Sequence, residues 1–175
     1  LAKIKIAKGY NPGAWESIEK GESAIDHSKV VYVLRGADHP QVWIWLKENN
    51  LPELKEWLEN NQKSPSEIIH FKTRLTLTMQ ARVLIALGKA NPGETYLQDA
   101  AELLDELLVM AEENGWGNKV IEILCLQALA SRVHEKDDDR ALEILSKALQ
   151  KAELEGFIRT FVDEGPAMAS LLYSL

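Results

Sequence analysis

The sequence is poor in cysteine, in uninterrupted apolar runs and in excess positive charge. Cys125 is the one cysteine, so no disulfide can form within these residues, and we expect a reducing cytoplasm. No run approaches the roughly 18 apolar residues of a membrane-spanning helix, and no signal peptide is visible. The 27 acidic residues outnumber the 20 basic ones, and the net charge of −7 argues against direct contact with nucleic acid.

Motifs for catalysis, nucleotide binding and metal binding are also missing from the sequence. It contains neither the phosphate-loop pattern G-x-x-x-x-G-K-[ST] nor the nucleophile pattern G-x-S-x-G. Cys125 has no His or Lys beside it, so we expect a buried, inert thiol. We therefore expect no catalytic residue, no metal site and no bound cofactor, and a protein that is not an enzyme. The histidines lack metal-ligand spacing, and many carboxylates are interpreted as solvated helix faces: His27, His39, His70 and His134; Glu102, Asp105, Glu106, Glu112 and Glu113.

Two stretches of the chain resemble each other at a spacing of 41 residues. Residues 100–116 and 141–157 share alanine, glutamate, leucine and glycine at matching positions, and each ends with an aromatic residue after its glycine. A weaker similarity links residues 2–9 with residues 81–88, and an Asn-Pro-Gly sequence follows each of them. Self-similarity at such a period is typical of stacked helix pairs.

Capping residues and glycines divide these repeats into helices. Ser64-Pro65-Ser66-Glu67 is a capping box with proline at the first helical position, so we expect a helix over 65–87. Gly88 is expected to end that helix in a left-handed conformation. Three further helices are expected at about 94–114, 118–134 and 138–155, the last begun by the acidic run 137–139.

These signals predict an all-α fold, a tetratricopeptide-like right-handed superhelix of antiparallel helix pairs. One pair cannot bury its apolar stripe alone, so neighbouring pairs stack and share a continuous core. We expect one domain over residues 1–175, with an irregular middle at 37–63, regular repeats at 64–156 and closing helices at 157–175. Such a stack leaves a concave face, which is the usual place for a ligand or partner.

Polar residues on the first helix of each pair are the candidates for this concave face. Arg74 and Arg82 suit an anionic or polyhydroxy ligand, because the guanidinium group presents its donors in a fixed fork. The alternative, that these are ordinary exterior residues, stays open. The predicted binding residues are His70, Arg74, Thr78, Arg82, Asn118, Glu122 and Gln127.

The irregular middle segment is rich in tryptophan. Pro40 and Pro52 are expected to begin short helices there. Trp43 and Trp45 point to different faces at helical spacing, and Trp57 follows in the next predicted helix. The cluster either packs between helices or forms a platform for a sugar or aromatic ligand, and the sequence leaves both readings open.

The C-terminal segment departs from the repeat. Residues 158–164 are expected to form a short helix, Gly165 an interruption, and Pro166 the start of a closing helix. Asp163 and Glu164 stand near a helix end that disfavours negative charge, so we expect them to have partners, with Arg159 one turn back as the nearest choice.

This segment closely resembles the G-[FY]-x-R-x-F-x-[DE]-E-G-x-x-[ML] stretch of large ATP-dependent transcriptional regulators of the MalT type, which carry LuxR-like DNA-binding ends. The run VIEILCLQALA at 120–130 is also similar to a helix of that family. The resemblance implies that the pattern positions are structural and close the superhelix. These positions are Gly156, Phe157, Arg159, Phe161, Asp163, Glu164, Gly165 and Pro166.

The family implies a regulator of three parts: an ATP-binding switch, a helical-repeat sensor of an inducer, and a helix-turn-helix that binds promoters after self-association. We expect this chain to be the sensor, binding a small-molecule inducer or a protein partner on its concave face, with self-association as a further possibility. The family implies that ATP is bound only by a missing N-terminal domain, since the phosphate loop is absent from this sequence. The first residue, Leu1, is not Met and falls inside a helical pattern, so we expect further residues upstream. The alternative is a general tetratricopeptide-like scaffold for protein–protein interaction, unrelated to transcription.

Overall fold

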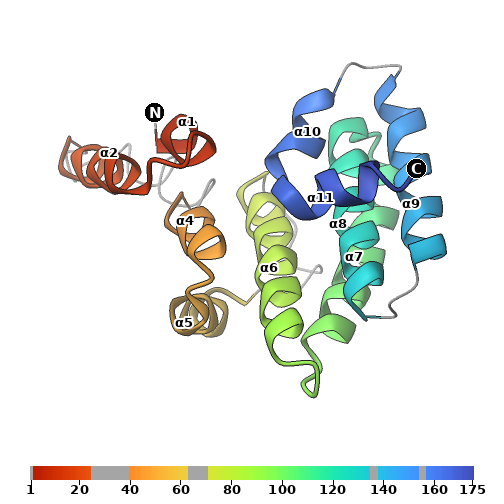
Figure 1. Ribbon diagram of the computed structural model, residues 1–175, viewed down its shortest axis with the longest axis horizontal. Coiled ribbons are helices and arrows are strands. Elements are labelled where there is room, and N and C mark those ends of the chain that lie inside the picture. Colours follow the sequence, from red (N-terminus) through yellow and green to blue (C-terminus); the bar gives the residue numbers. More distant parts are fainter. Residues whose placement is uncertain (1, 25–39, 63–70, 135–137, 154–156) are drawn as a thin grey trace. The chain divides into compact units, whose positions relative to one another are not determined.

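The computed structural model describes residues 2–24, 40–62, 71–134, 138–153 and 157–175, and Figure 1 shows their helices. Throughout these residues the regular structure is α-helical and no strand occurs, which confirms the expected all-α class. The chain divides into two compact units, Leu1–Val83 and Leu84–Leu175. The boundary between them falls within α6 (Phe71–Ala90).

The first unit has a small apolar core. Its buried side chains are Ile6, Ala14, Ile18 and Ile44, and Trp15 and Trp43 pack against them. Apolar side chains of three helices meet here because none of these short helices can bury its own stripe alone. The helices of this unit that precede α6 are α1 (Ala2–Ala7), α2 (Asn11–Ala24), α4 (Pro40–Glu48) and α5 (Leu51–Asn61).

In the middle segment, prolines stand at the starts of helices and tryptophans pack against other side chains. Pro40 is the first residue of α4, and Pro52 lies in the first turn of α5, as expected. The rings of Trp15 and Trp45 lie 6.2 Å apart between centroids and are tilted by 51°. Trp57 is buried, so these aromatic side chains contribute to packing within the unit.

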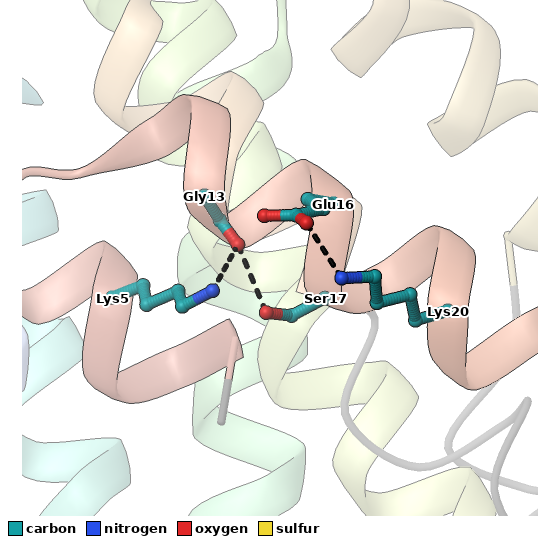
Figure 2. A network of polar contacts seen from close by, with 5 residues as sticks. All are labelled: Lys5, Gly13, Glu16, Ser17 and Lys20. Carbon is teal, nitrogen blue, oxygen red and sulfur yellow. Dashed lines mark hydrogen bonds and ion pairs between the residues drawn. The ribbon is translucent and has the colours of Figure 1, made fainter.

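Polar contacts join the ends of α1 and α2 (Figure 2). Nζ of Lys5 and Oγ of Ser17 both donate hydrogen bonds of 2.9 Å to the carbonyl oxygen of Gly13. On the exposed side of α2, Nζ of Lys20 lies 2.6 Å from a carboxylate oxygen of Glu16. The Lys5 contact crosses from one helix to the next, and therefore fixes the tight connection between them.

The second unit contains helices that pack in succession. α7 packs on α8 and α8 on α9, while α10 and α11 pack on each other and on α8. At the start of α9, Asp138 and Asp139 place negative charge near the positive end of the helix dipole, and Lys151 lies near the opposite end. The bounds are α7 (Tyr96–Glu113), α8 (Gly117–His134), α9 (Asp138–Glu153), α10 (Ile158–Asp163) and α11 (Gly165–Leu172).

The spacing of 41 residues relates α7 to α9 in the structure as it does in the sequence. Four pairs of residues at equivalent positions are buried in both helices. The buried pairs are Ala100 with Ala141, Leu104 with Leu145, Leu107 with Ala148, and Ala111 with Ala152. The two helices are therefore equivalent elements of successive repeats, each placing an apolar stripe against α8.

Glycine is required at positions 115 and 88 for different structural reasons: backbone conformation at Gly115 and close packing at Gly88. Gly115 has a φ of +67° just after α7, the left-handed conformation that ends a helix. Gly88 was expected to do the same after residue 87, and this expectation is wrong, because α6 continues to Ala90 and Gly88 has no positive φ. A Cβ at Gly88 would lie 2.5 Å from Cγ of Leu97, so glycine here permits the start of α7 to approach α6 closely.

The C-terminal helices follow the expected pattern. Gly165 has a φ of +73°, and Pro166 lies in the first turn of α11. Phe161, Met168 and Leu171 are buried and hold α10 and α11 in the unit. No helix among the described residues is long and apolar enough to cross a membrane.

Candidate functional site

A groove of about 680 Å³ lies in the second unit between α7 and α9, over the surface of α8. It is open to solvent. Its apolar lining comes from all three helices, which are seen together in Figure 1: Leu97, Ala101, Leu108, Leu124, Ala130 and Ile144. The other nine of its 15 lining residues are polar or charged, so the groove offers both apolar and polar contacts to a ligand.

The two walls of the groove carry opposite charge. Asp105 and Glu112 lie on the α7 side, and Arg140, Lys147 and Lys151 lie on the α9 side. Glu143 also belongs to α9, so that wall has three positive charges and one negative charge. A ligand in this groove therefore meets carboxylates on one side and mainly cations on the other.

Hydrogen bonds and ion pairs position these charged groups. Nε2 of Gln127, on α8, donates a hydrogen bond of 2.6 Å to a carboxylate oxygen of Asp105. Nζ of Lys147 donates one of 2.7 Å to Glu143. This hydrogen bond lowers the pKa of Glu143 from its ordinary value, and the positive charges of Lys147 and Arg140 also lower it. These hydrogen bonds hold the carboxylates of Asp105 and Glu143 at the groove.

One ion pair crosses the groove from wall to wall. Nζ of Lys151 lies 3.9 Å from a carboxylate oxygen of Glu112, and both side chains are about half exposed, at 51% and 52%. The same two residues also line a second hollow of about 380 Å³ at the C-terminal end of α7. Its other lining residues are Ala111, Gly115, Gly117, Val120 and Ile121. The ion pair therefore lies where the groove and the second hollow meet.

The predicted binding residues on α6 are buried. Thr78 is 3% exposed and Arg82 is 9% exposed. The guanidinium group of Arg82 lies over the Trp43 ring and donates a hydrogen bond of 3.3 Å to the carbonyl oxygen of Thr78. The side chain of Arg74 and the whole of His70 lie outside what the structure describes.

The predicted residues on α8 have separate positions. Asn118 is exposed in the first turn of the helix. Glu122 is half-buried, and Nζ of Lys119 lies 2.5 Å from its carboxylate oxygen. Gln127 alone of the three lines the groove. The structure therefore places one predicted binding residue at the groove and the other described ones elsewhere.

Sequence reasoning missed the α7 wall. Asp105 and Glu112 are exposed, in agreement with their interpretation as solvated faces, and they also line the groove. The signal was present in the spacing of 41 residues, since equivalent helices of successive repeats lie in one layer and face each other across the element between them. Charges of opposite sign on 105–112 and 140–151 could then have been assigned to two facing walls.

The family-pattern residues lie around α10 and the turn to α11. Nε of Arg159 lies 3.4 Å from a carboxylate oxygen of Asp163, which confirms the expected partner. Phe161 is buried, and Gly165 and Pro166 form the turn and the start of α11. Phe157 and Glu164 are half-buried beside them, and Gly156 lies outside the described residues. No group of three or more potential metal ligands occurs in the part of the chain that the structure describes.

Stacked helix pairs beside a groove define a helical-repeat region. The chain matches the family described as "MalT-like TPR region" over residues 1–175, and it belongs to that family. It is similar to "HTH-type transcriptional regulator MalT" of Serratia proteamaculans (strain 568), with 28% identity over 176 residues. That alignment covers 100% of the chain and 18% of the relative, so the chain spans about a fifth of the relative's length. No solved structure matches the chain.

Proposed function

We propose that this region is the sensor of a transcriptional regulator and that the groove between α7 and α9 receives the effector or partner. Occupancy of the groove is coupled to self-association and DNA binding, which other parts of the protein perform. The observation that carries the proposal is the apolar groove with charged walls in a chain of the MalT-like repeat family. Family membership also favours this role over a scaffold unrelated to transcription.

The proposal assigns binding and not catalysis to these residues. The net charge of −7 disfavours contact with DNA by this region itself. We assign ATP binding to another domain of the regulator. We also propose that the regulator acts in the cytoplasm, where it can reach promoter DNA. His70 and Arg74 remain predictions for the concave face, and Gln127 lines the groove beside Asp105.

Filling the groove tests this function in the intact regulator. Ala101 is a half-buried residue of the groove lining, and Ala101→Trp places an indole where the ligand would lie. Induction of a target promoter in the native host should be lost, while the thermal unfolding midpoint stays within a few degrees.

Val109→Trp is the matched control, because Val109 is 57% exposed on the same helix and does not line the groove. This variant should keep normal induction. A folded Ala101→Trp protein that is induced normally would contradict the proposed function.

A further inference from the structure

We propose that the groove and the second hollow form one channel for a peptide segment that carries both acidic and basic residues beside an apolar one. The Lys151–Glu112 ion pair opens when this peptide enters. The inference rests on the proposed function, because it names the class of ligand for the same groove.

The charges of the walls favour a ligand of both signs. An anion held by Arg140 and Lys147 would also face the carboxylates of Asp105 and Glu112 across the groove. The 3.9 Å distance between Lys151 and Glu112 shows that side chains of the two walls reach each other, so a ligand there contacts both. Like charges brought together at an interface are costly, and a ligand of one sign is therefore disfavoured.

The length of the groove favours a chain-like ligand. Its lining on α7 runs from Leu97 to Glu112, and at about 1.5 Å per helical residue this is about 22 Å. An extended peptide advances about 3.3 Å per residue, so the groove takes about seven residues. The apolar lining, with Leu108 and Leu124 among its residues, provides a place for an apolar side chain between the charged ones.

The ion pair that separates the two hollows is easily displaced. Both partners are half exposed, the distance of 3.9 Å is long, and exposed pairs of this kind contribute little to stability. Charged groups of a peptide can replace each partner in turn, a base beside Glu112 and an acid beside Lys151. The second hollow then becomes the continuation of the groove.

Three peptide pools test the charge preference on the intact protein by fluorescence anisotropy. Each pool contains peptides of about eight residues with two leucines and four charged residues in random order, either all Glu, all Lys, or two of each. The pool with both signs should bind about tenfold more tightly than either single-sign pool. Equal or weaker binding of the mixed pool would overturn the proposal.

Neutralising one wall should shift this preference in a set direction. Asp105→Asn should improve binding of the acidic pool relative to the basic pool, and Lys147→Gln should do the reverse, each by about threefold to tenfold. Glu106→Gln is the matched control, because Glu106 is exposed on α7 and does not line the groove. Preferences that stay unchanged in both wall variants would place the peptide elsewhere.

Filling the second hollow tests the channel. Gly117 is the first residue of α8 and has no positive φ, so Gly117→Leu adds a side chain to the hollow without backbone strain. Affinity for the mixed pool should fall about fivefold or more. Gly21→Leu, at an exposed position of α2 with open space around it, should leave affinity unchanged. Unchanged affinity in Gly117→Leu would confine the ligand to the groove and refute the channel.

The two proposals fail in different ways. Loss of promoter induction in Ala101→Trp, without preference for the mixed pool, would leave the sensor function standing and remove the peptide ligand. Preferred binding of the mixed pool, with normal induction in Ala101→Trp, would retain the peptide site and remove its regulatory role.

Discussion

The guanidinium carbon of Arg82 lies 4.8 Å from the centroid of the Trp43 ring, between α6 and α4. Arg82 is 9% exposed, and Trp43 packs against the small apolar core of the first unit. A cation over the face of a tryptophan is attracted by the negative face of the ring, and more strongly when water is excluded. The pair therefore stabilises the first unit.

Replacing Arg82 by methionine should lower the stability of the first unit. The expected loss is about 2 kcal/mol, because a desolvated cation–π contact is lost and the apolar stem is kept. Urea unfolding followed by tryptophan fluorescence measures it. In a cycle with Trp43→Leu, the two effects should be non-additive by about 1 kcal/mol, and strict additivity would show that the contact contributes nothing.

Gly88→Ala should destabilise the second unit although alanine is the better helix former. The added Cβ would lie 2.5 Å from Cγ of Leu97, and such overpacking costs about 1–3 kcal/mol against a propensity gain of about 1 kcal/mol. Gly21→Ala, in α2 with open space around it, should instead stabilise by about 0.5–1 kcal/mol. Chemical denaturation of both variants checks the sign, and stabilisation in both would refute the close approach of α7.

The pKa of Glu143 should respond to its neighbours in a fixed order. It is lowered chiefly by the hydrogen bond from Lys147, so Lys147→Met should raise it toward the ordinary carboxylate value, and Arg140→Met should raise it less. Because the folded pKa is depressed, the contact stabilises above the unfolded pKa, and this is lost as the pH falls through the folded pKa. Carbon-13 NMR titration of the carboxyl group measures these shifts. A larger effect of Arg140→Met would contradict the assigned cause.

Phe161→Ala should unfold the closing helices more readily than any change at the neighbouring ion pair. Phe161 is 6% exposed, and loss of a buried phenyl ring costs about 3–5 kcal/mol. Arg159→Met removes an exposed pair, in which the side chains are 71% and 47% exposed, and should cost at most about 0.5 kcal/mol. Thermal unfolding compares the two variants. A similar loss of stability in both variants would show that the pattern residues have a role other than packing.

Helix positions could be predicted where local signals decide them. The helices expected at 94–114, 118–134 and 138–155 occur as α7, α8 and α9 with ends within two residues. Apolar periodicity, the acidic residues at 138–139 and the glycine at 115 all act within one or two turns, so they are readable from the sequence.

Burial on α6 and the walls of the groove could not be predicted in the same way. A helical projection places Thr78 and Arg82 on a polar face, but Trp43 covers the Arg82 guanidinium, and that contact comes from a residue 39 positions away. Likewise the acidic face of α7 becomes one wall of a groove only because α9 places Lys147 and Lys151 on the other wall. Both depend on tertiary packing, which amphipathic periodicity does not specify.

The thiol of Cys125 has no exposed surface within α8, and it is the one thiol in 175 residues. A small alkylating reagent can therefore reach it only during the moments when α8 separates from its neighbours, so the rate of labelling counts these openings. Any molecule that clamps α7 and α9 over α8 should slow the reaction. The alkylation rate of Cys125 thus reports how often the helices that form the groove separate, and no label has to be introduced into the sequence.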